Sequence, residues 1–202
     1  GKAGTNYDGT PKFIELYAKK DVNLQNYRMR DQLTNGPTYV YSYVMNAINK
    51  TLNAGEFMII YYPSNTSEFS SFFGDTPSNL YSYALYENYF YYTMRNGDDS
   101  YALEKKIDGV WTYVDRVGDG YSGAGKSHDY DDGWLYRKQG STPTATFNAN
   151  DWTACKDCLE STTNAGGTTP FPLKSFTSNV TLTQSSDTLK LKDVTTLASG
   201  YQ

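Results

Sequence analysis

Apolar residues alternate with polar ones along much of the chain, with the period of two that a β-strand requires. Segment 13–17 alternates in this way, and in segment 39–44 three tyrosines would share one face while two valines share the other. The run 57–62 is apolar throughout, which indicates a strand buried on both faces. Further runs of these kinds predict strands at 80–86, 89–95, 101–107, 111–117 and 134–138.

Glycine-containing turns separate the predicted strands. Asn96-Gly97 and Asp108-Gly109 each stand between two apolar runs, and both dipeptides favour the tight turn of a β-hairpin because they adopt positive φ readily. Helical spacing is found in segment 67–73, where phenylalanines at 69, 72 and 73 follow a serine that can cap the helix. The pattern therefore predicts an all-β protein, an antiparallel sandwich or barrel with one short helix.

The composition changes after Trp152, and we take residues 1–152 as the β-sandwich domain. Residues 153–175 contain both cysteines and a run of Thr, Gly and Pro, which is typical of an irregular loop or linker. Residues 176–202 alternate again, with apolar positions at Val180, Leu182, Leu189 and Leu191. We expect this extension to form a β-strand that docks either on its own domain or on a neighbouring subunit.

Tyrosine is unusually frequent: the chain has 202 residues, of which 20 are tyrosine, and a net charge of −4. The acidic balance disfavours nucleic acid and anionic lipid as partners, and no apolar run has the length of a membrane span. Eleven tyrosines lie in residues 39–92, on both faces of the predicted strands. Because a sandwich buries one face of each sheet, we expect some rings to point outward into an interface, with the candidates Tyr81, Tyr83, Tyr89 and Tyr91.

Two short motifs suggest chemistry. Residues 120–127 satisfy the phosphate-loop pattern G-x-x-x-x-G-K-[ST], but that motif needs a helix to begin at Lys126 so that free amides hold the phosphate. The next residues have the composition of a turn, so we favour a glycine-rich hairpin loop. Cys155 and Cys158 form a C-x-x-C motif in a chain with one histidine, which favours a local disulfide over a zinc or redox site, provided the compartment is oxidising.

Two acidic clusters are candidate calcium sites, because calcium prefers carboxylate and carbonyl oxygens. The candidate ligands are Asp98, Asp99, Asp129, Asp131 and Asp132. Their spacing differs from that of an EF-hand loop, and solvated turn aspartates are the alternative. The lone histidine, His128, has no nucleophile motif beside it, so we expect neither an enzyme nor another cofactor.

Three sequons of the type Asn-x-Ser/Thr begin at Asn49, Asn65 and Asn179. All three lie near predicted turns or in the C-terminal extension, where an acceptor for N-linked sugar must lie. They indicate a glycoprotein if the chain comes from a eukaryote.

Four motifs, in this order, resemble the lamin-tail domain family. The opening strand with residues 21–29 resembles its first element, and LNAGEFMII at 52–60 is similar to its second. Residues 96–118 resemble its NGDD hairpin, and WLYRK at 134–138, followed by Phe147 and Trp152, resembles its closing signature. The resemblance covers about residues 12–152. It implies an immunoglobulin-like antiparallel β-sandwich that serves as a non-catalytic interaction module.

These features together predict a secreted, non-catalytic structural protein. We expect it to assemble with copies of itself into an extracellular filament, sheath or matrix, with the C-terminal strand adding to the sheet edge of a neighbour. The alternative is a carbohydrate-binding or surface-binding accessory module, in which exposed tyrosines stack on sugar rings.

Overall fold

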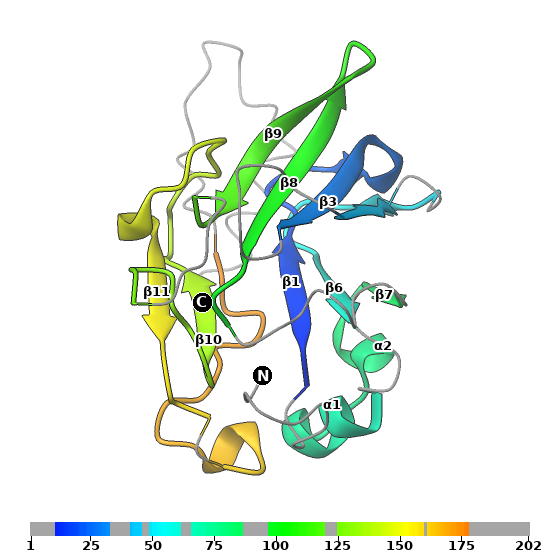
Figure 1. The fold of residues 1–202 in the computed structure, drawn as a ribbon. Helices are drawn as coiled ribbons and strands as arrows, with labels where there is room; N and C mark the ends of the chain where they lie inside the picture. The colour runs from blue at the N-terminus through cyan, green and yellow to red at the C-terminus, as the bar shows by residue number, and fades with distance from the viewer. Residues whose placement is uncertain are drawn as a thin grey trace, which may run out of the picture.

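The computed structural model describes residues 11–32, 41–45, 49–61, 66–86, 97–119, 125–159 and 161–177. These segments form mostly β-strands in several sheets, with few helices (Figure 1). The all-β prediction is therefore confirmed at the level of fold class.

The strands of the described segments form four sheets. The largest is antiparallel and has the order β4 (Tyr41–Val44), β3 (Tyr27–Gln32), β8 (Ser100–Ile107) and β9 (Val110–Val117). The second contains β1 (Phe13–Tyr17), β6 (Phe57–Tyr61) and β7 (Tyr83–Tyr86). The two others are antiparallel pairs: β2 (Val22–Asn23) with β5 (Thr51–Leu52), and β10 (Trp134–Arg137) with β11 (Trp152–Cys155).

The predicted helix is present as α1 (Thr66–Phe73), followed by the short α2 (Pro77–Leu80). Single 3-10 turns lie at Leu24–Asn26, Ala149–Asp151 and Asn164–Gly166. Strands β6 and β7 run parallel, and α1 and α2 lie between them in the chain. This pairing corrects the prediction of a wholly antiparallel fold. Parallel neighbours require such a crossover, whereas a tight turn joins antiparallel ones.

Strand β6 lies at the centre of the core, and all five of its side chains are buried. Met58 and Ile60 pack toward Leu24, Met29 and Tyr101, from the side of the four-stranded sheet. The alternate residues, Phe57, Ile59 and Tyr61, pack on the other face against a cluster that includes Phe69, Tyr81 and Phe176. The prediction that the run at 57–62 is buried on both faces is therefore confirmed over the five residues of β6.

The turn between β8 and β9 is the one that the sequence predicts. Asp108 and Gly109 both have positive φ, at 49° and 82°, and Ile107 pairs with Val110 across them. Such a two-residue turn matches the twist of the two strands. Figure 1 shows the resulting hairpin extending beyond the other described strands and helices.

The predicted domain boundary after Trp152 falls inside strand β11, which continues to Cys155. Further along, Phe176 is buried in the second core cluster, and Leu173 packs against that cluster. Residues up to 177 therefore belong to the same fold as β1 and β6. Residues 178–202, which contain the four apolar positions of the predicted extension, lie outside the described residues.

The first prediction concerns this packing. Replacing Phe176 by alanine should lower the free energy of unfolding by about 3 kcal/mol, because the substitution leaves a cavity among Tyr17, Phe57 and the rest of the cluster. Urea denaturation measures the difference. Val110→Ala, at an exposed position, is the control and should change stability by less than about 0.5 kcal/mol. Equal stability of the Phe176 variant and the wild type would show that the segment does not pack on its own domain.

Candidate functional site

A partly buried carboxylate joins three parts of the fold. Glu15 on β1 accepts hydrogen bonds from the hydroxyl groups of Tyr81, at 2.7 Å, and Tyr136, at 3.2 Å. It also accepts one from the backbone N–H of Lys174, at 3.1 Å. Burial raises the pKa of Glu15 above its ordinary value, because desolvation of the charged form outweighs the three hydrogen bonds that favour it.

The same group of side chains holds the C-terminal part of the described chain. The Tyr136 hydroxyl accepts a hydrogen bond from the backbone N–H of Phe176, at 2.8 Å, and burial raises the pKa of Tyr136. The Lys174 ammonium donates to the carbonyl of Leu80 and lies 5.9 Å from the centre of the Tyr81 ring. These contacts fix segment 171–177 over β1 and the end of α2.

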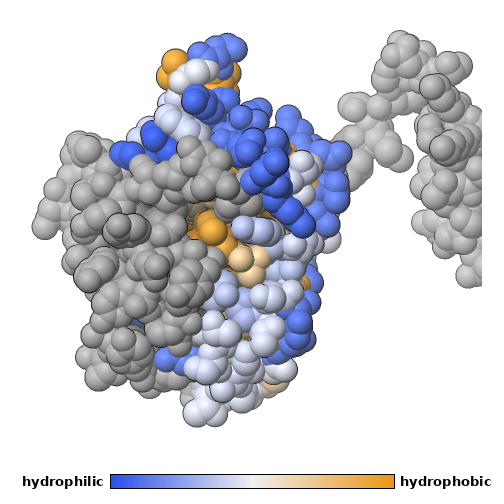
Figure 2. All heavy atoms as spheres, turned by 90° about the vertical axis from the view of Figure 1, so that its right-hand side faces the viewer, coloured by the Kyte–Doolittle hydropathy of each residue, from blue (hydrophilic) through white to orange (hydrophobic). Residues whose placement is uncertain are grey.

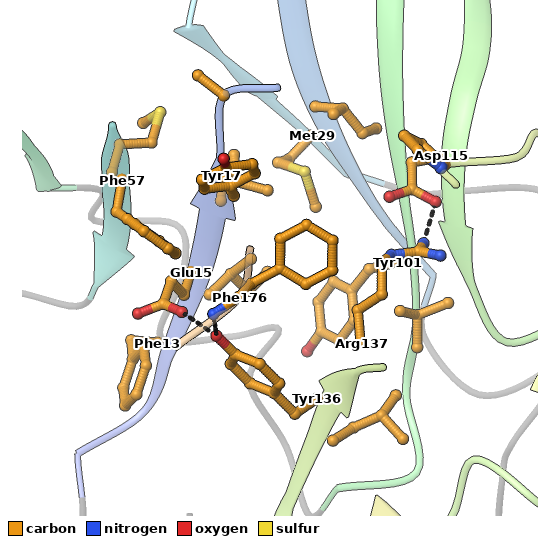
Figure 3. Close-up of a pocket in the computed structure, with 18 of the residues that line it drawn as sticks. Phe13, Glu15, Tyr17, Met29, Phe57, Tyr101, Asp115, Tyr136, Arg137 and Phe176 are labelled. Atoms are coloured by element: carbon orange, nitrogen blue, oxygen red, sulfur yellow. Dashed lines mark hydrogen bonds and ion pairs between the residues drawn. The ribbon is translucent and has the colours of Figure 1, made fainter. Parts of the chain in front are cut away.

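A cavity of about 650 Å³ lies beside this cluster, among residues of β1, β8, β9 and β10 (Figure 3). Its volume is in the range of small-molecule sites. Apolar and aromatic side chains make up most of its wall, among them those of Phe13, Tyr17, Met29, Phe57, Tyr101 and Phe176. The arrangement favours a ligand with a large apolar part.

An ion pair stands in the wall of the cavity. Arg137 on β10 pairs with Asp115 on β9, and its guanidinium lies 4.1 Å from the centre of the Trp152 ring. Asp115 also accepts from the backbone N–H groups of Arg116, at 2.8 Å, and Thr144, at 3.4 Å. Burial still raises the pKa of Asp115, because desolvation outweighs the effect of Arg137. Both acids of the cavity, Glu15 and Asp115, are thus engaged by donors of the protein itself.

A second candidate surface is the tip of the β8–β9 hairpin. Val110 is 64% exposed, Ile107 43% and Tyr113 37%, and these are the exposed large hydrophobic residues of the described chain. Figure 2 shows apolar atoms at the tip of a protrusion at the top of the molecule, where Figure 1 places the hairpin. Exposed apolar side chains gathered on one projecting element indicate an interaction surface.

Trp111, in the same hairpin, is held by cations of its own sheet. The Arg28 guanidinium lies 4.5 Å from the centre of the Trp111 ring, and the Lys106 ammonium lies 5.9 Å from it. Arg28 also pairs with Glu104 on β8. The ring of Trp111 is therefore fixed on the hairpin, so it forms part of a preformed surface.

The predicted calcium ligands occupy two segments that pack together. The N–H of Tyr130 donates to the carbonyl of Gly97 at 2.8 Å, and a Cβ atom at position 97 would lie 2.7 Å from the Asp131 backbone, so only glycine fits. Asp98 and Asp99 are buried, as is Asp129, which corrects the alternative of solvated turn residues for these three; Asp131 and Asp132 are partly exposed. Among the described residues no three acids, histidines or cysteines are grouped to hold a metal ion.

Asp129 has internal partners of its own. It accepts hydrogen bonds from the Lys156 ammonium at 2.7 Å and from the N–H groups of Gly125 at 2.8 Å and Asp131 at 3.2 Å. Burial alone would raise the pKa of Asp129, but these donors outweigh it and lower the pKa. For Asp131, burial and the neighbouring carboxylate of Asp132 raise the pKa.

The residues of the phosphate-loop pattern lack the required helix. Residues 125–128 form turns, and Lys126 pairs with Asp119 at 3.2 Å; residues 120–124 lie outside the described segments. His128 is buried, with its ring 5.2 Å from that of Phe147 at an angle of 74°. His128 therefore packs segment 125–131 against Phe147.

The two cysteines form the predicted local disulfide, Cys155 to Cys158, with Cα atoms 5.8 Å apart. Asn49 is exposed, as a glycosylation acceptor must be, whereas Asn65 and Asn179 lie outside the described residues. Among the helices that the structure describes, none has the length and apolar character needed to cross a membrane.

The tyrosines chosen as surface residues do not form one patch. Tyr81 is buried in the second core cluster, which corrects its assignment to an interface, and Tyr83 is partly buried against the first cluster. Tyr89 and Tyr91 lie outside the described residues. The alternation predicts a continuous strand over 80–86, but the strand begins at Tyr83. Tyr81 follows α2, and its hydroxyl group donates to Glu15.

Glu15, Tyr136 and Arg137 are not predicted as site residues, because each stands in a strand pattern that gives it no special role. The signal for Glu15 was present: it is a charged residue between apolar neighbours in a strand whose neighbour β6 is wholly apolar. The hairpin tip also had a signal, since Ile107 and Val110 flank the turn directly.

The second prediction follows from the raised pKa of Glu15. An acid whose pKa is higher in the folded protein binds its proton more tightly there, so its contribution to stability falls as the pH rises from 4.5 through the folded pKa. Glu15→Gln keeps an acceptor for Tyr81 and cannot ionise. The free energy of unfolding of the variant, relative to wild type, should therefore increase between pH 4 and pH 7, as measured by urea denaturation. The same difference at both pH values would contradict the assignment.

No protein-family model matches the chain, and a search of the curated proteins finds no similar sequence. The resemblance to the lamin-tail domain therefore rests on the order of the sequence motifs and stays a prediction.

Proposed function

We propose that this chain is a secreted, non-catalytic structural protein that assembles with copies of itself. In this proposal an immunoglobulin-like sandwich of the lamin-tail type carries an acceptor surface, the β8–β9 hairpin. The C-terminal strand of a neighbouring copy is the element that binds there. The observation that carries the proposal is the exposed apolar edge of β9.

The upper half of β9 has the properties of an acceptor edge. Among the described strands β9 pairs with β8 alone and stands at the end of its sheet. A strand at the end of a sheet presents backbone N–H and C=O groups that another strand can bind. Residues 110–114 carry no charge, although charged side chains are a common means by which proteins protect such an edge.

A change of register separates this upper half from the lower one. Leu103 pairs with Asp115 and Glu104 with Tyr113, so Val114 is an extra residue in β9. Such a bulge bends the strand and increases its twist. The lower half is fixed to the body through the ion pair of Asp115 with Arg137, whereas the upper half continues into the projecting tip.

The proposed donor is the alternating C-terminal segment of a second copy. Its apolar positions, Val180 with Leu182 and Leu189 with Leu191, have the period of two that places both members of a pair on one face. Val110 and Tyr113 are exposed and lie on opposite faces of β9, because side chains alternate along a strand. An added strand would therefore cover Val110 with one of its faces and Tyr113 with the other. Because donor and acceptor are different surfaces, each copy could bind two others, and the assembly would extend without closing.

Two further features support an extracellular setting. The Cys155–Cys158 disulfide fits an oxidising compartment, and the exposed Asn49 begins one of three sequons. The carbohydrate-binding alternative is not favoured by a particular observation, since Tyr81 is buried.

The third prediction tests the acceptor. Val110→Glu combined with Tyr113→Glu should weaken self-association by about tenfold or more, because strand addition would bury the new carboxylates. Light scattering over a range of protein concentrations measures the effect, and urea denaturation checks that the fold is kept. Ser71→Glu combined with Ser78→Glu places two acids at exposed positions of α1 and α2, away from the hairpin, and serves as the control. Unchanged assembly of the hairpin variant would exclude this edge.

The fourth prediction tests the donor. A chain that ends at Thr177 keeps Phe176 and the partners of Glu15, so it should unfold at the same urea concentration as the full chain. It should remain monomeric in light scattering where the full chain associates. Adding a peptide of residues 178–202 should block association of the full chain. Normal assembly of the shortened chain would contradict the proposal.

A further inference from the structure

We propose that the cavity between β1 and the β8–β9 strands binds a free long-chain fatty acid. Its hydrocarbon chain would lie in the aromatic interior, and its carboxylate would lie among lysines at one end. The inference does not rest on self-assembly, because the ligand would lie inside the cavity and the proposed acceptor is the outer edge of β9. The two sites share strands β8 and β9, since Ile107 and Val114 line the cavity.

The interior suits a hydrocarbon chain because its polar groups are already bound within the protein. Glu15 accepts from Tyr81, Tyr136 and Lys174, and Asp115 is paired with Arg137. A polar ligand would have to displace these partners, whereas a methylene chain contacts the surrounding rings without doing so. Figure 3 shows the rings of the wall, from different elements, facing the same space.

Aromatic side chains gather at one end of the cavity. Phe13, at the start of β1, meets the ring of Phe171 edge to face, with centroids 5.2 Å apart, and that of Phe73, at 5.6 Å. All three residues line the cavity. These three rings are apolar, so this end fits the methyl end of the ligand.

The opposite end carries positive charge. Strands β1 and β8 point the same way in Figure 1. Lys19 and Lys20 follow β1 and Lys105 is near the end of β8, so we infer that the three lysines lie toward one end of the cavity. All three lysines line the cavity. The ion pairs of the described residues join other cations to acids and include none of these lysines.

These lysines select the charge of the ligand. Three ammonium groups around an apolar opening attract a single carboxylate and repel a cation. The Lys105 ammonium lies 5.9 Å from the centre of the Tyr27 ring, and Tyr27 also lines the cavity. The charged end is therefore continuous with the apolar wall, as an amphiphile with one anionic head requires.

The test uses the full chain and cis-parinaric acid, a fatty acid that becomes fluorescent when it enters an apolar site. We expect saturable binding that palmitate displaces. The triple variant Lys19→Ser, Lys20→Ser, Lys105→Ser should weaken displacement by palmitate about tenfold and leave displacement by methyl palmitate unchanged, because the ester has no charge. Lys50→Ser, Lys106→Ser, Lys138→Ser removes the same charge outside the cavity and should bind like the wild type.

A second variant tests the interior. Leu103 lines the cavity, and Leu103→Trp should fill part of the cavity and so reduce binding of both the acid and the ester. If circular dichroism shows that this variant is unfolded, Leu16→Phe, at another lining residue, takes its place in the test. Absence of saturable binding would overturn the proposal. An affinity for palmitate that is the same in the wild type, the cavity variant and the triple lysine variant would also overturn it. Binding to phosphatidylglycerol vesicles that palmitate does not displace would point instead to a membrane surface, and would also overturn it.

Discussion

Burial of β6 on both faces is the constraint on which the rest of the structure depends. Each large apolar side chain that is removed from water contributes about 1.5–3 kcal/mol, more than a typical single hydrogen bond. The four-stranded sheet covers the face of Met58 and Ile60, and α1 with segment 171–177 covers the face of Ile59. The crossover from β6 to β7 and the position of the C-terminal segment both follow from the need to cover that second face.

Covering the sheet with an irregular segment creates a need for polar partners. Segment 171–177 has no strand ladder, so side chains satisfy several of its backbone groups, in addition to the local turn hydrogen bonds. Glu15 and Tyr136 accept from the N–H groups of Lys174 and Phe176, and Gln139 accepts from the N–H of Thr177 and donates to the carbonyl of Ser175. The carboxylate of Glu15 stands beside the core because the irregular segment that covers this sheet needs an acceptor for its backbone N–H groups.

The cavity and the hairpin have a common origin in the way that β8 and β9 leave the core. Near the base, Tyr101 is buried in the first core cluster and Val117 packs against it. Beyond the bulge at Val114 the strands carry Lys105 toward the cavity and expose Val110 at the tip. One pair of strands therefore contributes both to an apolar interior with a basic end and to an uncharged sheet edge.

Local order was predictable from the sequence because it depends on neighbours along the chain. The strand period, the Asp108-Gly109 turn, the phenylalanine spacing of α1 and the disulfide between cysteines three residues apart are all of this kind. The parallel pairing of β6 with β7, the inward direction of Tyr81 and the burial of Asp98 and Asp129 were decided by the tertiary structure alone. They depend on which elements meet in space, since the same tyrosine or aspartate is a surface residue until another segment covers it.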